Sequence, residues 1–511
     1  MNKMGKQTYG QILKSSMLIG GSSVLNIGLG IIRTKAMALL LGTTGYGLLS
    51  LYQSISDLTR SLAGLGVNTS GVRQIAEAVG SGDTQRIART VITLRRVAFY
   101  SGALGALLLL IFCREVSRLT FGDDRHAGAV ALLSLAVFFG DVSAGQGALV
   151  QGMRRIADLA RMSVLGALYG TVFSIPIIYF YYRRGEAEQG VVPSLVCVAA
   201  MGIITSWWYA RKIKVERAVM TVPQVVGEVS ALLKLGIVLM ATGLMTFGVS
   251  YLIRIILRRE MNLEAVGVYT AASTLGIIYV QFIVQAMGAD FYPRLTAIAN
   301  DNIECNRLVN EQAEVGLLMA CPGIIATLTF APLVIELFYS SKFGPAVEIL
   351  RWICLGMVLR VASWPIGFVL LAKGERNLFF WAEVLCNAVY VGLVWVGILK
   401  FGLKGAGIAF FGVYIVSLSL NYVIVRRLSG FQWSAANRRL ALLFAPLIAA
   451  IFIAWYVFPH PVAVVLGVAA TLTTGIYSLK TLCTLIPLKR FPQPARKMII
   501  FFRLAQPDTT V

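Results

Sequence analysis

The chain has 511 residues, of which 57% are hydrophobic and only 14% charged, and its mean hydropathy is +0.75. A soluble domain carries about a quarter charged residues, so this composition excludes an ordinary soluble protein. The formal net charge of +22 does not indicate a nucleic-acid partner, because membrane proteins concentrate Lys and Arg in their cytoplasmic loops.

Apolar runs of about 20 residues recur along the whole chain, and each is long enough to cross a bilayer as a helix. We therefore predict an all-α polytopic membrane protein with about 14 transmembrane helices. The predicted spans cover about 16–41, 46–67, 97–113, 128–150, 162–182, 190–210, 235–257, 265–289, 313–338, 345–371, 378–399, 404–425, 440–459 and 461–483.

The basic residues are distributed unevenly over the predicted loops. If the N-terminus is cytoplasmic, about 30 of the 46 Lys and Arg residues fall on the cytoplasmic side and about 10 outside. An even number of spans returns the C-terminus to the cytoplasm. All loops are short, and the longest, about 68–96, 211–234 and 290–312, are expected to be partly helical.

A weak internal repeat relates two parts of the chain. An offset of 221 residues places Arg33 on Arg254 and Arg73 on Arg294, and the order of apolar spans agrees over six helices. Six is an even number, so both halves share one orientation, as in transporters built from parallel repeats. We predict two six-helix lobes, 1–215 and 216–430, an extra helix pair at 431–486 and a basic amphipathic cytoplasmic tail at 487–511.

Ionisable residues inside membrane helices are costly and usually have a function. Gln53, Asp57 and Arg60 lie on one helical face in the second span, and Gln281 occupies the position of Arg60 in the repeat. Their predicted role is to line a substrate cavity, although Asp57 and Arg60 can also neutralise each other across one turn.

Further ionisable residues lie at membrane depth in other spans. Arg33, Arg254 and Arg360 complete the predicted set of cavity residues that bind substrate. For ion or proton coupling the candidates are Asp57, Asp141 and Glu383. Arg254 lies close to the end of its span, where it can also extend to the interface.

No motif of an enzyme, cofactor site or metal site is evident. The sequence has no GxxxxGK[ST] phosphate loop, and its seven cysteines are scattered with only two histidines, so we expect no enzyme activity, no cofactor and no metal. Arginines that face a water-filled cavity can bind anions, and the geometry of phosphate matches the hydrogen-bond donors of the guanidinium group. The residues alone thus predict a transporter for an anionic or phosphate-bearing substrate.

Several segments resemble a known family. The run RTKAMALLLGTTGYG from Arg33 resembles the first span of bacterial polysaccharide exporters and O-antigen translocases. The stretch from Leu235 to Asp301, with EAVGVY at Glu264 and FYPRL at Phe291, is similar to O-antigen and enterobacterial-common-antigen flippases, as are the segments 341–343, 371–373 and 382–384. The resemblance covers about 1–430 and points to the multidrug/oligosaccharidyl-lipid/polysaccharide exporter superfamily. Shorter members have twelve spans and lack the extra pair.

The resemblance implies a flippase of the bacterial inner membrane that moves undecaprenyl-diphosphate-linked oligosaccharide, such as an O-antigen repeat unit of lipopolysaccharide, by alternating access. Spans 1, 2, 7 and 8 would line its cleft, and its partners would be membrane lipids, a polysaccharide polymerase and a chain-length regulator. Two alternatives stay open. One is a cation-coupled drug or small-molecule antiporter of the same superfamily, and the other is a membrane glycan polymerase or ligase.

Overall fold

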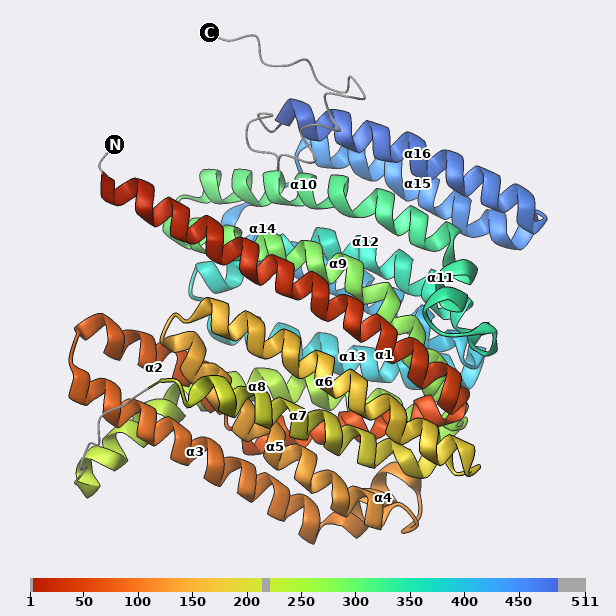
Figure 1. The fold of residues 1–511 in the computed structure, drawn as a ribbon. Helices are drawn as coiled ribbons and strands as arrows, with labels where there is room; N and C mark the ends of the chain where they lie inside the picture. Colours follow the sequence, from red (N-terminus) through yellow and green to blue (C-terminus); the bar gives the residue numbers. More distant parts are fainter. Residues whose placement is uncertain (1–2, 214–220, 486–511) are drawn as a thin grey trace. The chain divides into compact units, whose positions relative to one another are not determined.

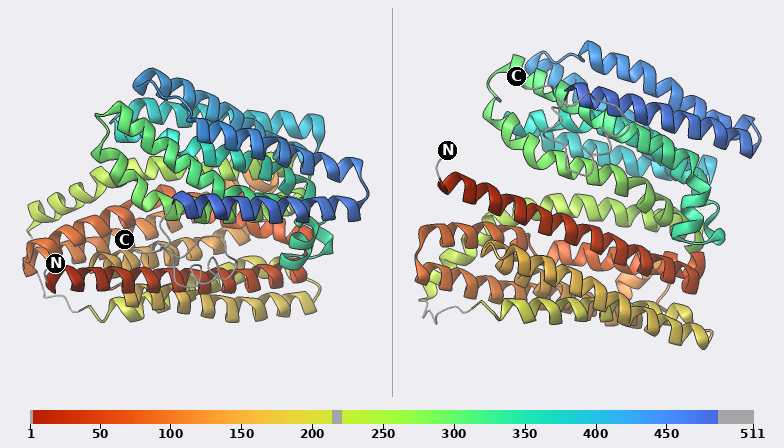
Figure 2. Two further views of the ribbon diagram at one scale, coloured as in Figure 1. Left: turned by 90° about the horizontal axis from the view of Figure 1, so that it is seen from above. Right: turned by 45° about the horizontal axis from the view of Figure 1, so that its top comes forward.

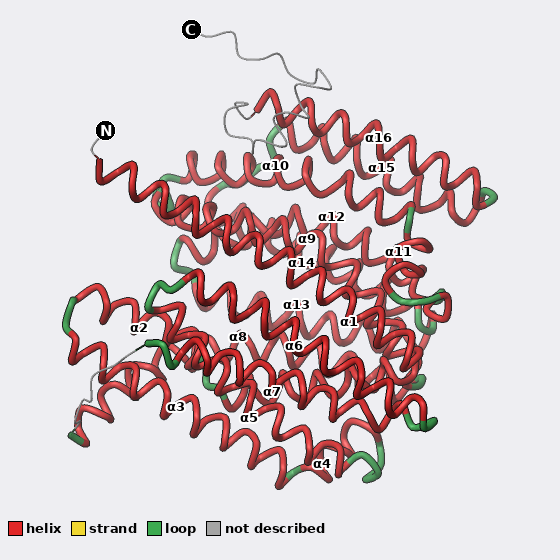
Figure 3. The backbone as a smooth tube through the Cα atoms, in the orientation of Figure 1, coloured by secondary structure: helices red, strands yellow, loops and turns green. Residues whose placement is uncertain are grey.

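The computed structural model describes residues 3–213 and 221–485. This part of the chain folds into sixteen α-helices and two short 3-10 helices, with no strand among the described residues (Figures 1 and 3). The helices are α1 (Lys3–Ala63), α2 (Val67–Ser81), α3 (Thr84–Ile111), α4 (Cys113–Phe121), α5 (Ala127–Gly152), α6 (Ile156–Arg183), α7 (Val191–Ala210), α8 (Val222–Glu260), α9 (Leu263–Ala297), α10 (Asn302–Thr329), α11 (Ala331–Phe338), α12 (Ala346–Ala372), α13 (Arg376–Phe401), α14 (Lys404–Ser429), α15 (Ala435–Val457) and α16 (His460–Leu485), with η1 (Ala187–Gly190) and η2 (Ser341–Phe343).

Thirteen helical stretches of the described chain are long and apolar enough to cross a membrane. The first of them, Gly21–Ala63, has 43 residues. At about 1.5 Å per residue it is long enough to cross a hydrocarbon core of about 30 Å twice. Gly42, with φ 65° and ψ −168°, breaks the helix at this point, and a residue without a β carbon adopts such angles easily. The structure therefore agrees with the prediction of about fourteen spans.

The loops predicted to be partly helical are partly helical where the structure describes them. α2 and the first turns of α3 fill residues 68–96, and α8, α9 and α10 extend well beyond their apolar parts. One difference between the halves is that α9 runs on continuously to Ala297, whereas the first half breaks after Ala63 at Leu65 and Gly66, with φ of 46° and 63°. The short helices α4 and α11 were not predicted.

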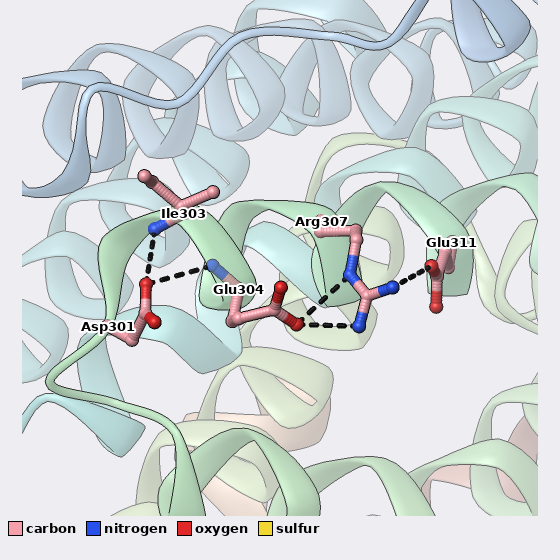
Figure 4. A network of polar contacts seen from close by, with 5 residues as sticks. All are labelled: Asp301, Ile303, Glu304, Arg307 and Glu311. Carbon is pink, nitrogen blue, oxygen red and sulfur yellow. Dashed lines mark hydrogen bonds and ion pairs between the residues drawn. The ribbon is translucent and has the colours of Figure 1, made fainter.

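The order of helices from α3 to α7 recurs from α10 to α14, including the short helices α4 and α11 that follow α3 and α10. Local capping recurs as well. Asp83 caps α3 by accepting from the backbone N–H groups of Gln85 and Arg86, at 2.9 and 3.1 Å. Asp301 caps α10 by accepting from the N–H groups of Ile303 and Glu304 at the same two distances. Arg307 pairs with Glu304 in the turn before it and with Glu311 in the turn after it (Figure 4). Side-chain caps satisfy N–H groups that have no partner within the helix.

By compactness the chain divides into unit 1, Met1–Val268 with Phe338–Lys342, and unit 2, Tyr269–Leu337 with Phe343–Val511. Helix α8 falls in unit 1 because it packs along α1, α2 and α3. The predicted lobes 1–215 and 216–430 rest on the sequence repeat, which is a different property, and they stay a prediction. In unit 2, α15 and α16 form a hairpin that packs against α10 (Figure 2). The predicted tail 487–511 lies outside the described residues.

Two glycines allow α1 and the start of α9 to approach closely within unit 1. A β carbon on Gly47 would lie 2.0 Å from the carbonyl oxygen of Leu263, and a β carbon on Gly267 would lie 2.0 Å from the carbonyl oxygen of Thr43. The contact is reciprocal, because each glycine faces the carbonyl group one helical turn before the other glycine. Only glycine fits at such a separation.

Candidate functional site

A cavity of about 370 Å³ opens inside unit 1. Gln53, Asp57 and Arg60, the polar stripe predicted for the second span, all lie on its wall. Apart from Ser56 on α1, the rest of the wall comes from α5, α6 and α7, and none of these lining residues was predicted as a site residue. These residues are mostly small or apolar: Leu133, Ala136, Gly140, Ser143, Ala144, Gly147, Met162, Leu195, Val198, Ala199 and Gly202. The charge of the cavity is therefore concentrated on the α1 wall.

Arg60 forms an ion pair with Asp141 on α5. Its Nε lies 3.4 Å from Oδ1 of Asp141, and its Nη2 donates to the carbonyl oxygen of Gly140 at 3.2 Å. The side chain of Asp141 is 3% exposed and that of Arg60 is 34% exposed. Gly140 makes room for the arginine, since a β carbon there would lie 2.6 Å from its Nε. The structure thus joins two predicted site residues that the sequence placed in separate spans.

Asp57, by contrast, remains half-buried near two arginines. Its electrostatic partners are Arg60, on its own helix, and Arg254, which comes from α8. Arg254 turns back along its helix, where Nη1 donates to the Ser250 carbonyl oxygen at 2.9 Å and contacts the Ser250 hydroxyl. Arg254 interacts electrostatically with Asp57 on α1, and its role stays a prediction.

Arg33 lies near a buried tyrosine that sequence reasoning did not single out. Tyr46 interacts electrostatically with both Arg33 and Arg254, and its ring packs edge-on against Tyr339, with centroids 5.4 Å apart. The signal for Tyr46 was present, because it lies in the GTTGYG run at the break between the first two spans. Tyr339 carried no such signal, because it joins unit 1 from a short segment far along the chain.

The second unit contains a polar group of its own. Arg360 on α12 donates from Nη2 to Oε1 of Gln281 on α9 at 2.8 Å. Glu383 on α13 interacts electrostatically with the same arginine, and the ring of Tyr414 lies 6.0 Å from its Cζ atom. Three predicted site residues thus meet in unit 2.

The polar contacts of the two units correspond. Gln281 occupies the repeat position of Arg60, and α12 follows α10 and α11 as α5 follows α3 and α4. In unit 1 the arginine lies on the second span and its acidic partner on α5. In unit 2 the arginine lies on α12 and its amide partner on α9. A polar contact thus joins the helices that the predicted repeat relates in each unit, with the arginine on the second span in unit 1 and on α12 in unit 2.

The contact in unit 2 is expected to contribute measurably to stability. Arg360→Ala removes the hydrogen-bond donor to Gln281 and the positive charge beside Glu383. Loss of a charge-assisted hydrogen bond costs about 1.5–3 kcal/mol of the free energy of unfolding. Thermal unfolding of the purified protein measures the change. Arg294→Ala is the control, because Arg294 forms an exposed i,i+4 pair with Asp290 and such pairs contribute about 0.3–0.5 kcal/mol. Equal effects of the two substitutions would contradict a structural role for Arg360.

No group of three or more His, Cys, Asp or Glu side chains that could hold a metal ion occurs in residues 3–213 and 221–485. Each of the seven cysteines is a free thiol. A ligand role for the cationic residues Arg33, Arg60, Arg254 and Arg360 and for the acidic residues Asp57, Asp141 and Glu383 stays a prediction.

Comparison with known proteins relates this arrangement to membrane transporters. The lipid III flippase of Escherichia coli K12 is 24% identical over 422 residues, 80% of this chain and 97% of the relative. The lipopolysaccharide biosynthesis protein WzxC of the same organism is 20% identical over 410 residues, 79% of this chain and 78% of the relative.

Two solved structures share the fold. The lipid II flippase MurJ in an inward closed conformation aligns with a TM-score of 0.62 at 14% identity, over 92% of this chain and 99% of that chain. A multidrug resistance MATE family transporter of the MOP superfamily, in an inward-facing conformation, aligns with a TM-score of 0.60 at 18% identity, over 80% and 95%. A family model described as polysaccharide biosynthesis protein matches residues 36–348. The chain therefore belongs to this family of polysaccharide biosynthesis proteins, and it has the fold of the MOP-superfamily transporters.

Proposed function

We propose that the protein is a flippase that carries an undecaprenyl-diphosphate-linked oligosaccharide, such as a repeat unit of a surface polysaccharide, across the bacterial inner membrane by alternating access. The observation that carries the proposal is the cavity of unit 1, with the charged residues Arg60 and Asp57 on its α1 wall, in a member of a polysaccharide biosynthesis family. The relatives named lipid III flippase and WzxC support this substrate class.

The physical task explains why such a cavity is needed. A sugar headgroup with a diphosphate cannot enter hydrocarbon without a large loss of hydration, so the protein must supply polar groups along the route. Arginine suits this task because its planar guanidinium group binds phosphate oxygens through two parallel hydrogen bonds. Arg33, Arg60, Arg254 and Arg360 are the proposed contacts for the diphosphate or for acidic sugars, and Gln53 and Gln281 are the proposed contacts for sugar hydroxyls.

The proposal extends to topology, coupling and partners. Both termini face the cytoplasm, where most of the basic residues then lie. Asp57, Asp141 and Glu383 are the candidate groups for proton or sodium coupling, since all three are carboxylates at membrane depth next to an arginine. A polysaccharide polymerase and a chain-length regulator are proposed partners that receive the flipped unit.

Transport in cells tests the roles of Arg33 and Arg254. A deletion strain complemented with Arg33→Ala or Arg254→Ala is expected to show at least about a tenfold loss of surface polysaccharide, as each substitution removes a charge-assisted contact with the substrate. Arg73→Ala is the control, because Arg73 forms an exposed pair with Glu77 and has no proposed substrate contact. Quantitative staining of the polysaccharide, with expression measured by immunoblot, gives the result.

Full complementation by both variants at normal expression would remove these arginines from the site. The related antiporter function has one observation in its favour, the shared fold of the MATE transporter. It predicts a changed sensitivity to cationic drugs in the deletion strain with an unchanged surface glycan, which is the opposite of the result expected here.

A further inference from the structure

We propose that a second pocket of unit 1, lined by α3, α5 and α7, binds the phosphate headgroup of an anionic glycerophospholipid. The pocket measures about 270 Å³ and contains two arginines, Arg95 and Arg211, with Phe99 and Trp207 beside them. It lies near the ends of α3 and α7 that are predicted to face the cytoplasm, so the inner leaflet supplies the ligand. This site does not depend on the proposed transport function.

Among the described residues, neither arginine has a carboxylate that would neutralise it. Arg95 donates from Nη2 to the carbonyl oxygen of Ala210 at 3.3 Å, at the end of α7, where the same oxygen also accepts from the Ile213 N–H group at 3.1 Å. Arg211 stacks on Trp208 and Trp207, with its Cζ 3.7 and 4.7 Å from the ring centroids. The pocket lining contains no acidic side chain, and no ion pair of Arg95 or Arg211 is found among the described residues. Within the described part of the chain, most of their N–H groups are therefore available to an anion.

The surroundings of the pocket are those of a lipid site. Phe99 is 50% exposed and Trp207 is 52% exposed, although both lie in helices long and apolar enough to span the membrane. Trp side chains such as Trp207 favour the level of the headgroups, where the apolar part of the ring meets hydrocarbon. An acyl chain can lie against these rings while the phosphate reaches the arginines. Basic pockets between membrane helices on the cytoplasmic side are known to bind anionic headgroups.

Helix α5 separates this pocket from the polar cavity described above. Gly140, Ser143 and Gly147 line the polar cavity, whereas Val142 and Gln146 line the phospholipid pocket from another face of the same helix. No residue lines both sites. A lipid in the second pocket is therefore distinct from a substrate in the first.

Lipid binding to the purified full-length protein tests the proposal. Native mass spectrometry measures the affinity for dioleoyl phosphatidylglycerol and, in parallel, for dioleoyl phosphatidylcholine. Each arginine near the surface contributes about fivefold to the affinity for an anionic lipid, so Arg95→Gln with Arg211→Gln is expected to weaken phosphatidylglycerol binding about 25-fold and to leave phosphatidylcholine binding unchanged. Arg96→Gln is the matched control, since it removes the same charge one residue away and outside the pocket.

Single variants keep the test decisive if the double variant fails to fold. Arg211→Gln leaves the bond from Arg95 to Ala210 intact and is expected to cost about fivefold, whereas Arg211→Lys keeps the charge and retains most of the affinity. An unchanged affinity in Arg211→Gln, or an equal loss in Arg96→Gln, would overturn the proposal. So would stronger binding of polyprenyl phosphate than of phosphatidylglycerol in competition, or displacement of the lipid by equimolar inorganic phosphate, because either result assigns the pocket to another source of phosphate.

Discussion

Gly47→Ala is expected to abolish most transport and to destabilise the protein, although it adds a single methyl group. The new β carbon would lie 2.0 Å from the Leu263 carbonyl oxygen, so α1 and α9 must move apart. Forcing extra volume into a packed contact costs about 1–3 kcal/mol, and here the obstacle is backbone that cannot rotate away. Surface polysaccharide in the complemented deletion strain and thermal unfolding of the purified protein measure the two effects.

The control is Gly30→Ala in the same helix, where a β carbon would have nothing within 4 Å. That substitution is expected to stabilise the helix by about 0.5–1 kcal/mol, because alanine loses less backbone entropy than glycine. Gly267→Ala should repeat the effect of Gly47→Ala. The variant with both Gly47→Ala and Gly267→Ala should lose less stability than the sum of the two single losses, since one separation of the helices relieves both collisions. Additive losses, or a Gly47→Ala protein that behaves like the Gly30→Ala protein, would contradict the reciprocal contact.

The helices could be predicted from the sequence because their signal is local. An apolar run of about 20 residues has few alternatives to a membrane helix, and the break at Gly42 follows from two spans joined by the GTTGYG run. The short helices α4 and α11 escaped prediction because they lie at the ends of longer apolar runs and are shorter than any periodicity test requires.

Much of the candidate site could also be predicted, but not its contacts. The spacing of Gln53, Asp57 and Arg60 places them on one face, and a polar face in a membrane helix needs a watered or polar neighbour. Which neighbour it meets depends on helix packing, which spacing along one helix does not encode. The pairing of Arg60 with Asp141, and of Arg360 with Gln281, comes from helices packed together by residues far apart in the chain. The α6 and α7 walls are apolar and gave no signal at all.

Arg60 and Asp141 form one ion pair, but replacing Arg60 is expected to cost more stability than replacing Asp141. Arg60→Gln leaves a carboxylate that is 3% exposed without its cation, and removing one partner of a buried pair costs about 3–5 kcal/mol. The lower end of that range applies, because Arg60 itself is 34% exposed and water partly screens the pair. Asp141→Asn should cost less, about 1–2 kcal/mol, since the arginine left behind borders a cavity where water can solvate it.

The double variant separates stability from transport. Arg60→Gln with Asp141→Asn places two neutral amides at the site of the ion pair and is expected to recover most of the stability lost by Arg60→Gln alone, because no charge is left buried without a partner. Transport should not recover, since the cationic group proposed to meet the diphosphate is gone. Arg73→Gln with Glu77→Gln, an exposed pair, should change neither property appreciably. Thermal unfolding and surface polysaccharide are measured on the same variants. If transport returns together with stability, Arg60 serves only to neutralise Asp141, and the substrate diphosphate must be bound by other arginines.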